Sequence, residues 1–133
     1  MRPLHTMVAV LLATLVCACG DENVMCPAFQ SPAVYVEVRN AADYTPAAGH
    51  ATGYLRNGTY VDSMYAGTVD GNGDTVGMSS VFAGAGTYEV VVQKSGFQTW
   101  RRTGVTVRHT RCGNESVRLV ALIEPLANRI SQE

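Results

Sequence analysis

The chain has 133 residues, of which 47% are hydrophobic and 16% charged, and its formal net charge at pH 7 is −1. This composition is that of one globular domain and not of a disordered tail. The chain is too short for two domains. The charge is nearly balanced and Arg101 and Arg102 are the only adjacent basic residues, so the basic stripe that nucleic-acid binding requires is absent.

The first segment of the chain predicts an export signal. Arg2 and His5 precede an apolar run over residues 7–19, which ends at Gly20. A helix needs about 20 apolar residues to cross a bilayer, so this shorter run fits the core of a signal peptide. We therefore predict that residues 1–18 are removed and that the mature protein is exported.

The stretch "LVCAC", residues 15–19, resembles a bacterial lipobox whose invariant cysteine falls on Cys19. The resemblance implies cleavage just before Cys19, a diacylglycerol on its sulfur, and an acyl chain such as palmitate on its new amine. Cys17 stands where alanine or serine is commoner, and Val16 where leucine is. Ordinary signal cleavage after Ala18 is the alternative.

The predicted lipid makes the membrane a partner of the protein. Acyl chains contribute roughly 0.8 kcal/mol for each buried CH₂, so two or three of them hold a protein stably. In many lipoproteins an aspartate directly after the lipidated cysteine retains the protein at the inner membrane. Gly20 stands there and Asp21 follows. The resemblance favours the outer membrane of the cell envelope and leaves the inner membrane as the alternative.

After a polar tether over residues 19–32, apolar and polar residues alternate with the period of two that is typical of β-strands. Val34, Val36 and Val38 share one face of the first predicted strand. Asn57-Gly58 predicts a hairpin turn between two short strands, and "DGNGD", residues 70–74, a further hairpin. Pro46 lies in a turn between the first strands.

The second half of the chain carries the clearest strand, in which Tyr88, Val90 and Val92 share one face. A turn at residues 95–96 leads to a return strand with Val105 and Val107, and residues 117–123 alternate before a tail over 125–133. No helical period persists. About seven short strands predict an all-β fold, a single seven-stranded transthyretin-like or Ig-like β-sandwich.

The run "GTYEVVVQKSGFQTWRRTGVTV", residues 86–107, resembles the carboxypeptidase regulatory-like domain, with Gly86, Tyr88, Gly96 and Phe97 at the positions of its glycines and aromatics. The resemblance extends over residues 33–123, loosely at 58–80. It implies a transthyretin-like β-sandwich over residues 33–124 without catalysis of its own. In that family the domain usually accompanies a catalytic or transport domain.

Once residues 1–18 are removed, Cys26 and Cys112 are the only cysteines besides Cys19. In an oxidising compartment two such thiols are expected to pair, which would tie the start of the domain to its last strand. The alternative is a pair of buried free thiols.

The sequence predicts no cofactor, no metal site and no enzymatic activity. It lacks the motifs of nucleophile elbows, zinc proteases and phosphate loops. Residues 70–74 resemble the start of a calcium loop, but Thr75 and Val81 stand where an EF-hand needs glycine and glutamate. A plain glycine-rich hairpin is the preferred interpretation, and calcium binding stays open.

Four aromatic residues are candidates for ligand binding, namely Tyr54, Tyr60, Tyr65 and Trp100. Together they would suit a platform for sugar rings, although such residues also cover sheets and edges. We predict a lipid-anchored, non-catalytic binding or structural module of the envelope, whose partner is an envelope protein or a glycan. The alternative is a carbohydrate- or peptidoglycan-binding module that uses these aromatics.

Overall fold

The computed structural model describes residues 24–127. All regular secondary structure within these residues is β-strand, and they contain no helix long and apolar enough to span a membrane. This confirms the predicted all-β class. The strands are β1 (Val34–Asn40), β2 (Thr52–Asn57), β3 (Tyr60–Val69), β4 (Thr75–Ser80), β5 (Gly86–Gln93), β6 (Trp100–Val107), β7 (His109–Thr110), β8 (Gly113–Asn114) and β9 (Val117–Ile123). The predicted signal peptide, Cys19 and the end of the predicted tail lie outside the described residues.

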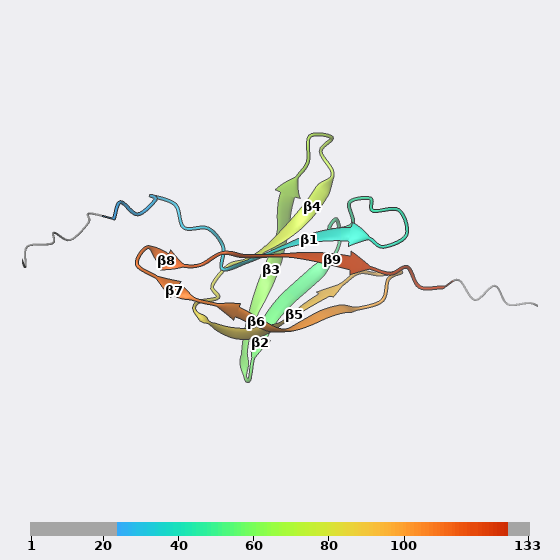
Figure 1. Cartoon of the computed structure of the whole chain (residues 1–133). Helices are drawn as coiled ribbons and strands as arrows, with labels where there is room; N and C mark the ends of the chain where they lie inside the picture. Colours follow the sequence, from blue (N-terminus) through green and yellow to red (C-terminus); the bar gives the residue numbers. More distant parts are fainter. Residues whose placement is uncertain (1–23, 128–133) are drawn as a thin grey trace, which may run out of the picture.

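Seven strands form one sheet in the order β6-β5-β2-β3-β4-β1-β9, and β7 pairs with β8 as a separate ribbon (Figure 1). Neighbours are antiparallel except for β1 and β9, which run parallel over seven residue pairs. The predicted number of main strands is found, but a sandwich of two sheets is not confirmed. Because β2 pairs with β3 on one edge and with β5 on the other, no break divides the sheet.

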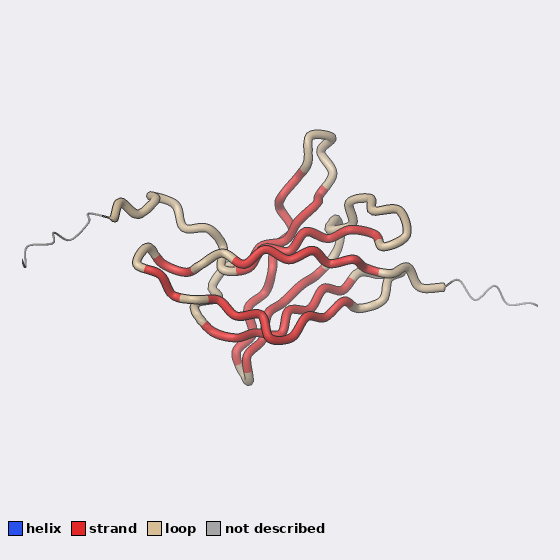
Figure 2. The backbone as a smooth tube through the Cα atoms, in the orientation of Figure 1, coloured by secondary structure: helices blue, strands red, loops and turns tan. Residues whose placement is uncertain are grey.

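The sheet curls until its two outer strands, β6 and β9, come together, as the tube in Figure 2 shows. At one end the Gln98 amide donates to the Glu124 carbonyl at 2.7 Å, and at the other the Glu115 amide donates to the Arg108 carbonyl at 2.8 Å. Between these bonds no ladder joins β6 to β9. The result is a mostly closed sheet with an open seam between its outer strands.

The core fills the inside of this curled sheet. Val34, Val36 and Val38 are fully buried, as their alternation predicts, and the inward faces of β5 and β9 meet them. The main buried residues are Leu55, Met64, Met78, Tyr88, Val90, Val92, Val105, Val107, Ala121 and Ile123. Val91 faces outward and is nevertheless fully buried, since it lies between Tyr54 of β2 and Arg101 of β6.

Both predicted hairpins form. Gly58, at φ 58°, begins the two-residue turn between β2 and β3, a conformation that glycine adopts without strain. In the hairpin between β3 and β4, the Asp70 carboxylate accepts bonds from the amides of Asn72 and Asp74 at 2.9 and 3.0 Å. Asp70 therefore shapes its own turn, in the usual manner of an aspartate at a loop start.

A buried carboxylate organises the loop between β4 and β5. Asp62 is 3% exposed, and its Oδ2 accepts hydrogen bonds from the amides of Val81, Phe82 and Ala83 at 3.2, 3.0 and 2.9 Å. Buried backbone donors need such partners. Asp62 thus replaces the strand partner that these three amides lack.

A disulfide joins Cys26 to Cys112 across 86 residues of sequence, with their Cα atoms 5.1 Å apart. It fastens residues 24–33, here called the strap, to the β7–β8 ribbon. Gln30 also packs there, since a Cβ added to Gly113 would lie 3.0 Å from the Gln30 side-chain nitrogen. The strap, predicted as part of a loose tether, is therefore held against the end of the sheet.

Three charged residues form a row across β2, β5 and β6 on the outside of the sheet. Glu89 bonds the Arg56 guanidinium through one oxygen, and Arg101 Nη1 lies 3.1 Å from the other. The hydrogen bond from Arg56 is the main reason that the pKa of Glu89 is lowered from its ordinary 4.5, and Arg101 adds to it.

Because the folded pKa of Glu89 is depressed, this row should stabilise the fold above about pH 4.5 and lose its contribution as the pH falls through the folded pKa. We expect Glu89→Gln to melt at a lower temperature than the wild type at pH 7, and the gap to close toward pH 3. Thermal unfolding at several pH values measures this. A gap that stays constant over the whole range would contradict the assignment.

Candidate functional site

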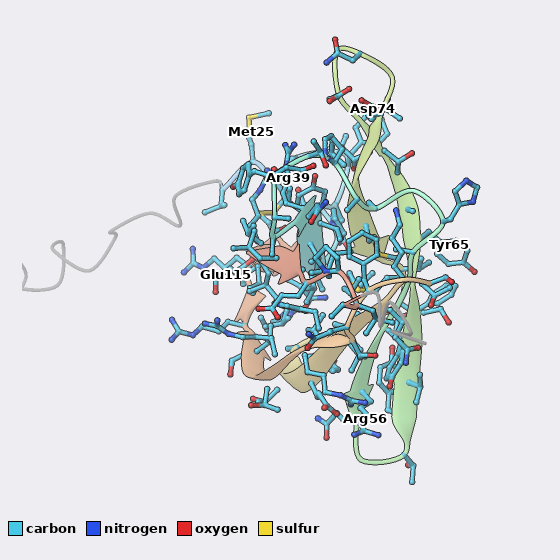
Figure 3. The ribbon with its side chains drawn as sticks, turned by 90° about the vertical axis from the view of Figure 1, so that its right-hand side faces the viewer. Met25, Arg39, Arg56, Tyr65, Asp74 and Glu115 are labelled. Carbon is cyan, nitrogen blue, oxygen red and sulfur yellow. A yellow bond between two sulfur atoms is a disulfide. The ribbon has the colours of Figure 1, made fainter. Side chains whose placement is uncertain are left out.

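The structure separates the four aromatics that are candidates for a ligand-binding platform. Tyr54 and Tyr65 share the outer face of β2 and β3 as diagonal neighbours, because Tyr54 pairs with Ser63, two residues before Tyr65. Tyr65 is 65% exposed and lies at the margin of the molecule in Figure 3, whereas Tyr54 is half-buried.

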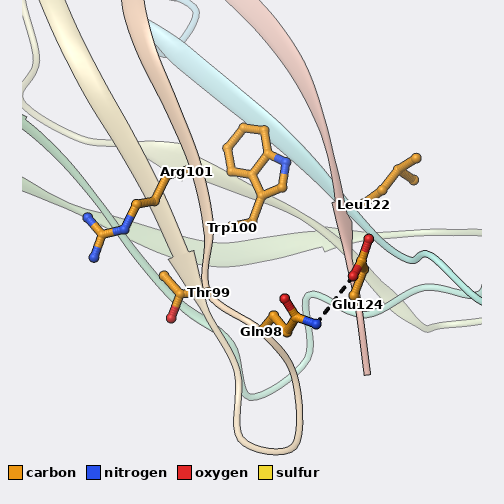
Figure 4. A pocket seen from close by; sticks show the side chains of 6 residues that line it. All are labelled: Gln98, Thr99, Trp100, Arg101, Leu122 and Glu124. Carbon is orange, nitrogen blue, oxygen red and sulfur yellow. Dashed lines mark hydrogen bonds between the residues drawn. The ribbon is translucent and has the colours of Figure 1, made fainter. Parts of the chain in front are cut away.

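Tyr60 and Trp100 lie on the inward-facing sides of their strands, although Tyr60, at the start of β3, is still 41% exposed. The Tyr60 ring lies 6.2 Å from that of buried Tyr88, and burial, followed by the charge of Asp62, raises the pKa of its hydroxyl. Trp100 packs against the core and borders a hollow of about 220 Å³ at the seam, beside Leu122 (Figure 4). Only two of the four candidate aromatics, Tyr54 and Tyr65, therefore share one outer surface.

A different hollow, of about 270 Å³, lies on the outer face of the sheet and is mostly polar. It is bounded by the strap, by β1, β3, β4 and β9, and by the residue before β9. Its lining consists of Ser31, Pro32, Tyr35, Thr68, Ser79, Ser116 and Arg118. We call it the Arg118 pocket.

Tyr35 is placed in this pocket by a glycine. Its side chain lies against the backbone of Gly77, where a Cβ would come within 2.2 Å of the Tyr35 hydroxyl oxygen. Arg118 pairs with Tyr35 across the parallel strands, and its guanidinium carbon lies 5.4 Å from the centre of the ring. A guanidinium stacked on an aromatic face is held in place and keeps its N–H edge for other partners.

The charge of Arg118 is not matched by a carboxylate among the described residues. Arg39, Arg56 and Arg101 each form an ion pair, and none of the ion pairs of residues 24–127 includes Arg118. Three serines and Thr68 line the same pocket as Arg118. A fixed guanidinium with hydroxyls at its side suits a ligand that carries a carboxylate and further polar groups.

Replacing Gly77 by alanine should disturb this arrangement, because the added methyl would occupy the space of the Tyr35 ring. Overpacking of this kind costs about 1 to 3 kcal/mol. We expect a urea titration to show that loss for Gly77→Ala. Gly67→Ala is the control, since a Cβ there meets nothing within 4 Å, and an equal loss in both variants would contradict the account.

Cys26 and Cys112 are bonded to each other, and Cys19 lies outside the described residues. Within residues 24–127 no group of three or more histidine, cysteine or acidic side chains is arranged to hold a metal ion.

The alternation of β1 and β9 puts Tyr35 and Arg118 on the faces opposite the buried residues, but no local pattern brings the two together. They are 83 positions apart and meet only because β1 and β9 are parallel neighbours. Gly77 gave a weak signal, because a glycine inside a strand often marks close approach of another group.

No family model and no curated protein matches the chain. Among solved structures, a chain of a C-terminal interface mutant of a type II cohesin–X-dockerin complex from Acetivibrio cellulolyticus is similar with a TM-score of 0.42 and 17% identity. The match covers 68% of this chain and 55% of that one, so this chain spans about half the length of the protein it matches. A similarity of this size says nothing about function.

Proposed function

We propose that this protein is a lipid-anchored, non-catalytic binding module of a bacterial cell envelope, and that it holds its ligand in the Arg118 pocket. The lipobox-like residues 15–19 support the anchor. The Cys26–Cys112 disulfide supports an oxidising compartment outside the cytoplasm, where such bonds persist.

The observation that carries the ligand proposal is the stacked, unmatched guanidinium of Arg118 among hydroxyl groups. A pocket of about 270 Å³ is at the small end for ligand sites and suits one unit of a larger polymer. Peptidoglycan combines sugars with peptide carboxylates and lies within reach of an envelope protein. We therefore propose a carboxylate-bearing peptidoglycan unit as the ligand.

The test is binding to peptidoglycan and to a soluble muropeptide. The mature protein should sediment with purified sacculi and bind the muropeptide in calorimetry. A hydrogen bond to a charged group contributes about 1.5 to 3 kcal/mol, so Arg118→Gln should weaken binding by roughly tenfold or more. The control is Arg102→Gln, since Arg102 is exposed on β6 and does not line the pocket.

Equal binding by both arginine variants would overturn the pocket as the site. A second candidate, a glycan platform, is favoured by the exposure of Tyr65 beside Tyr54. If Tyr65→Ala abolishes binding to sacculi and Arg118→Gln does not, the platform is the site. If no glycan is bound and crosslinking in the envelope recovers a protein that Arg118→Gln releases, the ligand is that protein.

The anchor is tested separately by mass spectrometry of the mature amino terminus. A diacylated or triacylated Cys19 is expected. An unmodified first residue at any other position would overturn the lipid anchor while leaving the pocket proposal untouched.

A further inference from the structure

The strap exposes three large apolar side chains that lie close together in sequence. Met25 is 93% exposed and Phe29 89% exposed, with Val24 beside them at 49%. The disulfide at Cys26 holds this segment to the fold. Large apolar side chains exposed close together on a fixed segment are candidates for contact with a partner.

Cationic side chains lie beside this apolar group. The β7–β8 ribbon, joined to the strap by the disulfide, carries exposed His109 and Arg111, and exposed Arg108 directly precedes it. None of these takes part in an ion pair of the described residues. Glu115 is the only acidic residue between positions 105 and 118. Figure 1 shows the strap and the ribbon at the same end of the sheet.

The length of the connecting chain limits how far this end can be from a lipid on Cys19. Cys26 is seven residues from Cys19, and seven extended residues span at most about 25 Å. Asp21 and Glu22 lie in that stretch and oppose attraction to an anionic surface. Apolar contact must therefore contribute together with the basic residues.

We infer that the strap and the β7–β8 ribbon form a membrane-contact surface for anionic phospholipid. Met25 and Phe29 enter the headgroup region, and Arg108 and Arg111 contact lipid phosphates. Apolar residues beside basic ones are the composition of segments that lie at a membrane interface. This orientation of the domain rests on the proposed lipid anchor, whereas the surface itself can be tested without it.

The test uses the mature chain from residue 19 with Cys19→Ser, which carries no lipid. We expect it to co-sediment with phosphatidylglycerol-rich vesicles at millimolar lipid and low salt, and to bind phosphatidylcholine vesicles more weakly. A basic residue near an anionic surface contributes about 1 kcal/mol, so each of Arg108→Gln and Arg111→Gln should lower the partition coefficient roughly fivefold. Met25→Ser with Phe29→Ser should lower it on both vesicle types.

The matched control is Arg102→Gln with Phe82→Ser, an exposed arginine and an 81% exposed aromatic in other parts of the fold. This control should partition as the parent does. No binding to anionic vesicles, or an equal loss in the control and in the strap and ribbon variants, would overturn the membrane-contact surface. Because the tested chain carries no lipid, that result would not bear on the lipid anchor at Cys19. Mass spectrometry of the mature amino terminus tests the anchor separately.

Discussion

Loss of the Cys26–Cys112 disulfide is expected to lower the free energy of unfolding by up to about 4 to 5 kcal/mol. The bond closes a loop with a sequence separation of 86 residues, and the chain-entropy account assigns a stabilisation of that order to loops of this length. The double variant Cys26→Ser/Cys112→Ser avoids a leftover thiol that could pair between molecules. Urea denaturation of the variant and the wild type under oxidising conditions measures the difference.

Reduced wild-type protein should match the double variant, which separates loss of the bond from an effect of the serines. A thiol titration of the denatured, unreduced protein should find neither Cys26 nor Cys112 reactive. Because Ser31 and Pro32 of the strap line the Arg118 pocket, muropeptide binding should weaken even where far-ultraviolet circular dichroism shows the sheet intact. A stability loss below about 1 kcal/mol would contradict the loop-closure argument.

Replacement of Asp62 by alanine should cost about 3 kcal/mol or more, the second large effect that we expect. Its carboxylate is the partner of the amides of residues 81–83; the bond to Ala83 is buried and the other two are partly buried. A buried donor left without a partner costs about 1 to 3 kcal/mol, and the two partly buried amides add to this loss. Asp62→Asn keeps one acceptor oxygen and should lose less. Urea denaturation gives the energies, and hydrogen exchange should show faster exchange at these three amides.

Asp74→Ala is the control for this prediction, since Asp74 is exposed at the hairpin tip and its carboxylate accepts no hydrogen bond from the described residues. Exposed substitutions of this kind usually change stability by no more than about 0.5 kcal/mol. Equal stability of Asp62→Ala and Asp74→Ala would show that the loop amides find other partners.

The strands themselves could be predicted because alternation is a local property of the sequence. Val34, Val36 and Val38 occupy the buried face that their period of two indicates. The pairing of Cys26 with Cys112 could be predicted because removal of the predicted signal peptide would leave few other cysteines. These predictions needed no knowledge of which strands are neighbours.

The arrangement of the sheet could not be predicted, because strand partners depend on contacts far apart in sequence. The parallel pairing of β1 with β9 creates the Arg118 pocket, and no local pattern indicates it. In the sequence Asp62 resembles any polar residue on an exposed strand face. Its role becomes visible only from the position of the loop between β4 and β5, whose amides it binds. The division of the aromatics was within reach, however, because Tyr60 and Tyr65 are an odd number of residues apart on one strand and must face opposite sides.

The disulfide also determines how the fold would carry a mechanical load. If Cys19 holds the lipid, tension between the membrane and the ligand enters the domain at Cys26. There the force is shared between the chain that leads to β1 and the disulfide to Cys112. From there it reaches β1 and β9 at the ends where both strands begin, because they run parallel. The two strands are then pulled in the same direction and their ladder is not sheared. Reduction of the disulfide would place the whole load on β1. The domain would then unfold more easily under tension from the membrane.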